Sequence, residues 1–211
     1  MGRGRSGTSG GASGGVNPNN IVSTTSLISE RGDKTTEVDD TLAVLRSVSE
    51  RYGVELNDVQ VAVLKGKDTN VLGYYDNGGN LAIGANYFDS AKMDAAYDRC
   101  IKSGFHPRRG SKSGMEAVVA HEMGHKLTDV AAQKMGLGNW NLDEAANRIV
   151  REAAKTTGKR TQAVRSAISG YASGRNAEAV AEAFADVFCN GNRARRESRA
   201  VVDALNKVLG V

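Results

Sequence analysis

Cysteine is scarce in this chain of 211 residues, which contains only Cys100 and Cys189. Two cysteines without a Cys-x-x-Cys spacing are too few for a disulfide framework and do not form a cysteine zinc site. We therefore expect both to be free, buried thiols. Aromatic residues are also sparse, at 5% of the chain, so the core must be built mainly from alanine, valine, leucine and isoleucine.

Long apolar runs are absent as well. No stretch approaches the roughly 18 residues that a membrane-spanning helix needs. The first residues, MGRGRSGTSGG, lack the apolar segment of a secretory signal. The sequence thus predicts a soluble, cytoplasmic protein that has neither a signal peptide nor a transmembrane segment and does not bind a membrane.

The excess of positive charge is small, with a net charge of +4. Much of it lies in GRGR at the start of the chain and in RARRESR at 193–199. A solvated helix face explains the second cluster more simply than a nucleic-acid partner does. A helical DNA-binding protein is therefore the weakest of three functional hypotheses, and the composition does not indicate an oligomeric state.

Composition divides the chain into two parts. Residues 1–20 are rich in glycine and serine and have almost nothing to bury, which predicts a flexible tail. Residues 21–211 have the length of a single domain. Hydrophobic periodicity in that part predicts a strand at 59–66, a hairpin around Asp76-Asn77-Gly78-Gly79, and helices at about 37–52, 89–103, 113–135, 142–157, 161–169, 176–189 and 194–208.

Local signals mark several helix ends. Gly53 is typical of the residue that follows a helix, Ser113 with Glu116 forms a capping-box pattern, and Asn176 is a candidate N-cap. The order of the elements, a small early sheet and then a helical remainder, predicts an α+β fold.

The pentapeptide HEMGH at 121–125 holds two of the three histidines of the chain. On an α-helix, residues four apart project from one face, so His121 and His125 can bind one metal ion. Glu122 lies about 100° around the helix from His121, close enough to reach a metal-bound water without being a ligand. The alternative is a solvent-facing helix that happens to carry two histidines.

A catalytic zinc usually has three protein ligands and a water. Thr128 and Ala131 occupy the positions where the metzincin pattern requires glycine and histidine, so that pattern fails. The third histidine, His106, lies in a loop with proline and glycine, where a histidine is more often simply exposed. A ligand from a later part of the chain is then needed.

The segment AEAVAEAFAD at 177–186 offers three carboxylates on one helix face, those of Glu178, Glu182 and Asp186. Acidic residues on a mostly apolar helix normally form a solvated face. Beside a helix that has two histidines and lacks a carboxylate, the interpretation as a His₂Glu site becomes the better one.

HEMGH followed by YASGRNAEAVAEAFAD resembles the gluzincin metallopeptidases, the group that includes the catalytic domain of anthrax lethal factor and its zincin-like relatives. Tyr171, Glu178 and Glu182 have the spacing found in that group. The resemblance covers roughly residues 115–187, and more loosely the hairpin. Domains of this type also occur in phage-encoded proteins, so a virion or the host cytoplasm is a further predicted location.

The resemblance implies a zincin-like metallopeptidase domain at 21–211, with a mixed sheet that has a hairpin edge, an HExxH helix and a later glutamate-bearing helix. It implies one Zn²⁺ bound by His121, His125 and Glu178. It also implies Glu122 as the general base and Tyr171 as the hydroxyl donor to the oxyanion. The predicted function is a zinc-dependent endopeptidase that acts on a protein or peptide. The alternative is a zincin-like binding or virion-associated structural module that keeps zinc without proteolysis.

Neighbouring residues suggest a support for these ligands. Glu182 lies one turn after Glu178, and Asp129 lies one turn after His125, so each can hydrogen-bond a ligating histidine and fix its tautomer. A surface salt bridge is the alternative for both. Gly124 would let another segment pack closely against the helix.

The hairpin suggests a substrate site. An exposed strand edge near the zinc can bind an extended peptide through main-chain hydrogen bonds. Of LGYYD and LAIGANYF, we favour the second as this edge because it leads into the site, and an ordinary sheet strand is the alternative. The residues of this predicted substrate-binding strand are Leu81, Ala82, Ile83 and Gly84.

Overall fold

The computed structural model describes residues 21–23, 35–54, 59–62, 70–76, 80–138 and 141–211. The predicted tail at 1–20, the second half of the predicted strand at 59–66 and the tip of the predicted hairpin turn lie outside these residues. No helix in the described part is long and apolar enough to cross a membrane.

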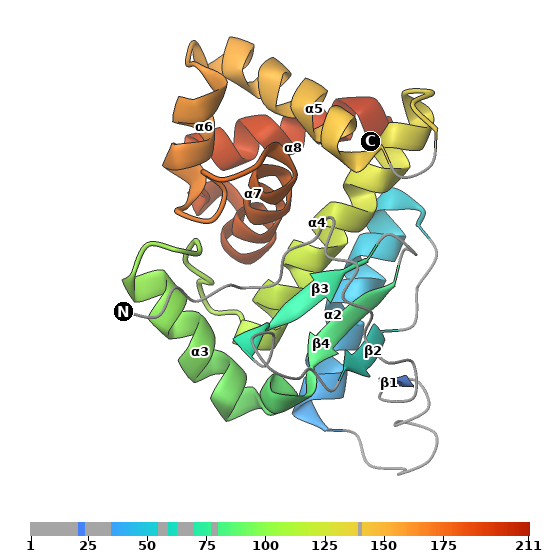
Figure 1. The fold of residues 1–211 in the computed structure, drawn as a ribbon, viewed down its shortest axis with the longest axis vertical. Coiled ribbons are helices and arrows are strands. Elements are labelled where there is room, and N and C mark those ends of the chain that lie inside the picture. Colours follow the sequence, from blue (N-terminus) through green and yellow to red (C-terminus); the bar gives the residue numbers. More distant parts are fainter. Residues whose placement is uncertain (1–20, 24–34, 55–58, 63–69, 77–79, 139–140) are drawn as a thin grey trace.

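The prediction of an α+β fold is confirmed, with helices far outnumbering strands (Figure 1). The strands are β1 (Ile21–Ser23), β2 (Val59–Ala62), β3 (Gly73–Tyr75) and β4 (Leu81–Gly84). The helices are α2 (Thr36–Tyr52), α3 (Ser90–Lys102), α4 (Gly114–Lys134), α5 (Leu142–Thr157), α6 (Thr161–Ile168), α7 (Asn176–Asn190) and α8 (Arg196–Leu209), with 3₁₀ turns η3 (Ala85–Tyr87) and η4 (Gly191–Arg193).

The strands form one mixed sheet in the order β1-β2-β4-β3. β3 and β4 pair antiparallel, as a hairpin does, whereas β2 and β4 run parallel and β1 pairs antiparallel with β2. β4 therefore has a neighbour on each side. The prediction of an exposed edge at this strand is wrong, because β2 pairs with one edge of β4 and β3 pairs with the other. This prediction concerned Leu81, Ala82, Ile83 and Gly84. In the described part of the chain, β3 is the outer strand of the hairpin.

Helix α4 lies in the middle of the molecule (Figure 1). It packs against α2, α3 and β3 on one side and against α5, α7 and α8 on the other. Sixteen of its residues are buried, which is the pattern of a helix enclosed by protein rather than of a surface helix. Polar side chains on α4 are consequently inside the protein and need partners there.

The approach of α7 to α4 depends on a glycine. A Cβ atom at Gly124 would lie 2.7 Å from Ala181 Cα and 3.1 Å from Phe184 Cβ. The first distance is shorter than the contacts that Cβ atoms make in proteins, and the second is tight. Gly124 therefore allows the backbones of the two helices to meet, as predicted.

Local signals place most helix ends correctly. Gly53 follows α2 with a left-handed φ of 63°, and Ser113 with Glu116 forms both bonds of the capping box. The prediction for Asn176 is wrong, because Arg175 is the N-cap of α7. Asn176 is the first helical residue, and its Nδ2 donates to Asn147 Oδ1 on α5 at 2.7 Å.

The core is rich in alanine and valine, as the shortage of aromatic residues predicts. Cys100 and Cys189 are both free, as predicted, but each is only partly buried. Burial still raises the pKa of the Cys189 thiol to about 12.

Candidate metal centre

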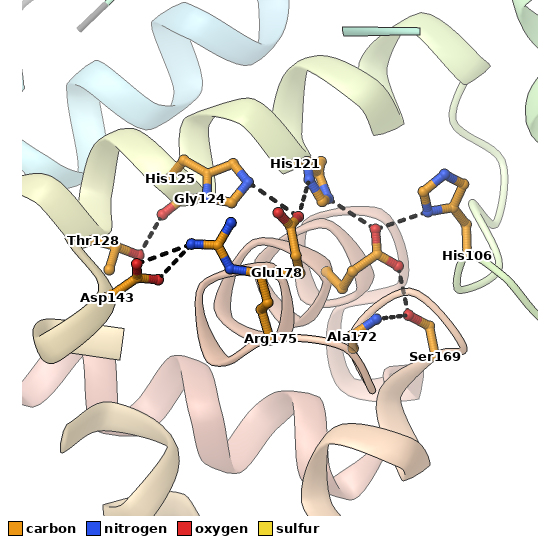
Figure 2. Close-up of polar contacts among 11 residues, drawn as sticks. His106, His121, Gly124, His125, Thr128, Asp143, Ser169, Ala172, Arg175 and Glu178 are labelled. Carbon is orange, nitrogen blue, oxygen red and sulfur yellow. Dashed lines mark hydrogen bonds and ion pairs between the residues drawn. The ribbon is translucent and has the colours of Figure 1, made fainter. Parts of the chain in front are cut away.

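His121 and His125 lie one turn apart on α4 and point their imidazoles toward α7 (Figure 2). Both side chains are buried, and His125 is fully enclosed. Their ring centroids are 5.0 Å apart. The interpretation of HEMGH as a solvent-facing stretch of helix is therefore wrong.

Glu178 on α7 faces the two histidines (Figure 2). Its Oε2 lies 3.4 Å from His121 Nε2 and 3.4 Å from His125 Nε2. Two ligands of a tetrahedral zinc, each at roughly 2.0–2.1 Å from the metal, are about 3.3 Å apart. The two distances from the carboxylate oxygen and the N₂O chemistry of the three groups therefore fit the ligand set of one zinc ion.

The two histidines keep Glu178 ionised despite its burial. Burial on its own raises the pKa of the Glu178 carboxyl, but His125 and His121 lower it well below its usual range. An ionised carboxylate is the form of Glu178 that binds a metal cation.

The start of α7 is tied to α5, which helps to hold Glu178 in place. Arg175 Nη2 lies 2.9 Å from both carboxylate oxygens of Asp143 (Figure 2). Together with the bond between Asn176 and Asn147, this pair fixes the first turn of the helix on which Glu178 lies.

Glu122 is buried beside the histidines. One ligand atom from each of His121, Glu122 and His125 lies within 4.8 Å of the others. In the described part of the structure, Glu122 Oε2 has no hydrogen-bond partner. Burial raises the pKa of Glu122 to about 7, against the opposing effect of the two histidines. A buried carboxyl that has this pKa, and one oxygen without a hydrogen-bond partner, is suited to proton transfer near neutral pH.

Strand β3 passes directly over Glu122. A Cβ atom at Gly73 would lie 3.0 Å from Glu122 Oε1 and 2.7 Å from Val118 Cγ1. A side chain at position 73 would displace Val118 or Glu122, so glycine lets the strand lie against the carboxylate. The first residue of the outer strand thus borders the site.

Tyr171 lies in the turn before α7, with its ring 5.8 Å from that of His121. Two backbone bonds hold this turn: Gly170 N donates to Gly104 O at 2.8 Å, and Tyr171 N donates to Phe105 O at 3.0 Å. Burial, with the negative charge of Glu178, raises the pKa of the Tyr171 phenol far above its usual value. The hydroxyl keeps its proton at neutral pH and remains a hydrogen-bond donor.

Glu182 lies one turn after Glu178 and is buried. Its Oε1 is 2.8 Å from His121 Nδ1, the contact that the sequence predicts. Its Oε2 accepts a hydrogen bond from Ser169 Oγ at 2.8 Å. Burial raises the pKa of the Glu182 carboxyl, but the nearby charge of His106 outweighs burial and lowers the pKa to about 2.

The third carboxylate on this face, Asp186, has a different role. It accepts from Ser198 Oγ at 2.6 Å and from Arg195 N at 3.0 Å, which attaches the start of α8 to α7. Glu178, Glu182 and Asp186 are all buried. The alternative of a solvated acidic face on α7 is therefore wrong.

His106 is buried, although the loop in which it lies predicts exposure. Its Nδ1 lies 2.8 Å from Glu182 Oε1. Its ring stacks on Tyr97 of α3, with centroids 5.1 Å apart and planes 4° from parallel. Glu182 is 76 positions away in the sequence, so the residues around His106 do not predict its burial. The one local indication is the aromatic residue before it, Phe105.

Asp129 lies on α4, one turn after His125. The hydrogen bond described for it comes from Tyr75 Oη on β3, at 2.9 Å. The Tyr75 ring in turn stacks on His125, with centroids 6.4 Å apart. Asp129 thus acts on the His125 environment through Tyr75, which joins β3 to the helix.

A small pocket opens beside His121 and Glu122. Its wall comes from β3, α3, α4 and the loops before α4 and α7. The lining residues are Leu72, Gly73, Tyr97, His106, Val118, His121, Glu122 and Tyr171. The candidate base Glu122, the candidate oxyanion donor Tyr171 and Gly73 of the outer strand therefore border one space.

No family model, curated protein or solved structure matches this chain. Inference about function consequently depends on the geometry and chemistry of the site.

Proposed function

We propose that this protein is a zinc-dependent endopeptidase with a zincin-like fold, similar to the gluzincins. The observation that carries the proposal is that Glu178 Oε2 lies 3.4 Å from both His121 Nε2 and His125 Nε2, close to the ligand–ligand distance of a tetrahedral zinc site. Glu122, adjacent in the same buried cluster, supplies a carboxylate that is not needed as a ligand.

The chain would hold the ion with His121, His125 and Glu178. Bound zinc lowers the pKa of a coordinated water to about 7 and polarises the carbonyl of a peptide. Glu122 takes the proton of the attacking water on its open Oε2 and then delivers it to the leaving amine. Tyr171 donates its hydroxyl proton in a hydrogen bond to the developing oxyanion.

The substrate would lie in extended form along β3. In the described part of the chain, β3 pairs only with β4, so its outer edge has backbone groups to offer a peptide. Gly73, the first residue of β3, brings this strand next to Glu122. This assignment replaces the one that the sequence suggested for β4.

The test is the variant Glu122→Gln, which keeps the shape of the side chain and removes its basicity. We expect stoichiometric zinc by metal analysis and a loss of cleavage of about 10²–10⁴-fold on a peptide library. Glu50→Gln, at an exposed position on α2, is the matched control and should cleave like the wild type. Undiminished cleavage by Glu122→Gln would refute the proposed mechanism.

One observation favours the second candidate, a zincin-like binding or structural module that keeps zinc without proteolysis. The candidate ligands are enclosed, with only 6% of His121 and 3% of Glu178 exposed, and structural zinc sites are closed in this way. The peptide library separates the two: cleavage at one class of sequence removes this candidate, and zinc binding without any cleavage supports it.

A further inference from the structure

We propose that His106 is a positioning residue of the metal centre, which holds Glu182 and, through it, the imidazole of His121. The inference rests on the proposed zinc site and extends it to a loop outside the HExxH helix and α7. It assigns His106 no contact with the metal or the substrate.

The Glu182 carboxylate is the centre of this arrangement. Its side chain is 1% exposed, so water does not satisfy its oxygens. Oε1 lies 2.8 Å from Nδ1 of both His106 and His121, and Oε2 accepts from Ser169 Oγ. The carboxylate therefore has three contacts, and the one with His106 comes from the loop before α4.

His106 itself is fixed in orientation. Its ring stacks on the ring of Tyr97. Its backbone N–H donates to Cys100 O, near the end of α3, at 3.4 Å. The preceding residue, Phe105, is bonded through its carbonyl to Tyr171 N. Because both the ring and the backbone of His106 are held in place, the position of its Nδ1 is fixed. That position determines where Glu182 Oε1 can accept a hydrogen bond.

Loss of the His106 donor leaves a buried carboxylate with less support. A buried carboxylate that loses a hydrogen-bond partner moves toward another donor, here Ser169 Oγ. Such a movement changes the 2.8 Å contact of Glu182 Oε1 with His121 Nδ1, and the orientation of the His121 ring determines how its Nε2 meets a metal ion. Loss of such outer partners typically weakens metal binding by about 10–100-fold.

The test compares three replacements by chelator competition for Zn²⁺ with the full chain. The Asn amide nitrogen occupies the position of Nδ1, so His106→Asn keeps the donor to Glu182. Leu removes the donor, and the Gln amide nitrogen matches Nε2 instead. We expect zinc affinity within about 3-fold of the wild type for Asn and a loss of about 10-fold or more for Leu and Gln.

A double-mutant cycle then asks whether His106 acts through Glu182. In a Glu182→Ala background, His106→Leu should change zinc affinity by less than about 2-fold, because the group that transmits its effect is gone. An equal loss with and without Glu182 would overturn the proposal. If the Leu variant does not fold, the Asn and Gln pair makes the same comparison with two polar side chains.

The outcomes separate this inference from the function on which it rests. A wild-type protein that binds no zinc refutes the proposed function. A wild-type protein that binds zinc, with His106→Leu and His106→Gln binding it equally well, refutes the role of His106 alone. Rescue by Asn but not by Gln supports it, since a merely space-filling role would not distinguish the two amides.

Discussion

At the scale of single residues, three buried glutamates in one site have different proton affinities. Burial raises the pKa of Glu122 to about 7. The histidines that contact the other two outweigh burial, so the pKa of Glu178 lies well below its usual range and that of Glu182 is about 2. Carboxyls whose environments separate their pKa values in this way have separate roles: Glu122 can exchange a proton near neutrality, and the other two stay ionised.

The hydroxyl of Tyr171 offers a second test at this scale. Tyr171→Phe keeps the ring that packs beside His121 and removes only the proposed donor to the oxyanion. We expect zinc stoichiometry to be unchanged and kcat to fall by about 10²-fold or more. Steady-state kinetics with a cleaved peptide measure this, and an unchanged kcat would remove Tyr171 from the mechanism.

At the scale of elements, the metal centre depends on how closely α7 approaches α4. The candidate ligands come from both helices, and the contact point between them is Gly124, one residue before His125. The glycine lies on the turn that separates the two histidines. The same position therefore determines the helix packing and the distance of Glu178 from both imidazoles.

Gly124→Ala should push the two helices apart. The added methyl group would meet Ala181 Cα at 2.7 Å, and backbone cannot yield as a flexible side chain does. We expect a net loss of about 2 kcal/mol in the free energy of unfolding, from overpacking partly offset by better helix propensity, and weaker zinc binding. Urea denaturation and chelator competition measure the two effects.

The matched control is Gly174→Ala, where the added Cβ would lie 3.5 Å from Tyr171 O, an ordinary contact. Its stability should stay within about 0.5 kcal/mol of the wild type. A Gly124→Ala protein as stable as this control, with wild-type zinc affinity, would show that the close approach is not needed.

Local and long-range information differ sharply in these elements. The ends of α2 and α4 follow from Gly53 and from the Ser113–Glu116 pair, because a cap is decided by neighbours in sequence. The position of β4 inside the sheet does not follow, since its parallel pairing with β2 is a contact between distant segments. The burial of His106 was missed for the same reason: its partner Glu182 is 76 positions away.

The candidate site divides along the same line. The His121–Glu122–His125 cluster was predictable because helical geometry alone brings these residues together. Glu178 and Glu182 were predictable from a resemblance in spacing, and the structure places both against the histidines. The replacement of β4 by β3 as the outer strand and the part played by Tyr75 required the tertiary structure.

At the scale of the whole molecule, the candidate metal centre lies at the junction of α4 and α7. Helix α4 separates the sheet, α2 and α3 from the helices at the C-terminal end (Figure 1). An ion bound by two residues of α4 and one of α7 would connect the central helix to that second group. Metal binding and global stability should therefore be linked.

Removal of zinc tests this linkage. With free zinc at 100 times its dissociation constant, binding stabilises the folded state by about 2.7 kcal/mol, which for a chain of this size corresponds to about 5–10 °C in Tm. EDTA should lower the Tm of the wild type by that amount and leave the Tm of Glu178→Ala nearly unchanged. Equal Tm values for the wild type with and without zinc would contradict a native metal site.

The two backbone bonds between the loop before α4 and the turn before α7 have a consequence for how the site opens. Gly104 with Gly170, and Phe105 with Tyr171, form a short clasp between these segments. Tyr171 and His106 lie at the ends of this clasp, so a motion that withdraws one displaces the other. In the proposed enzyme, admission of a substrate and support of the metal are then coupled: the pocket opens as one unit or stays closed.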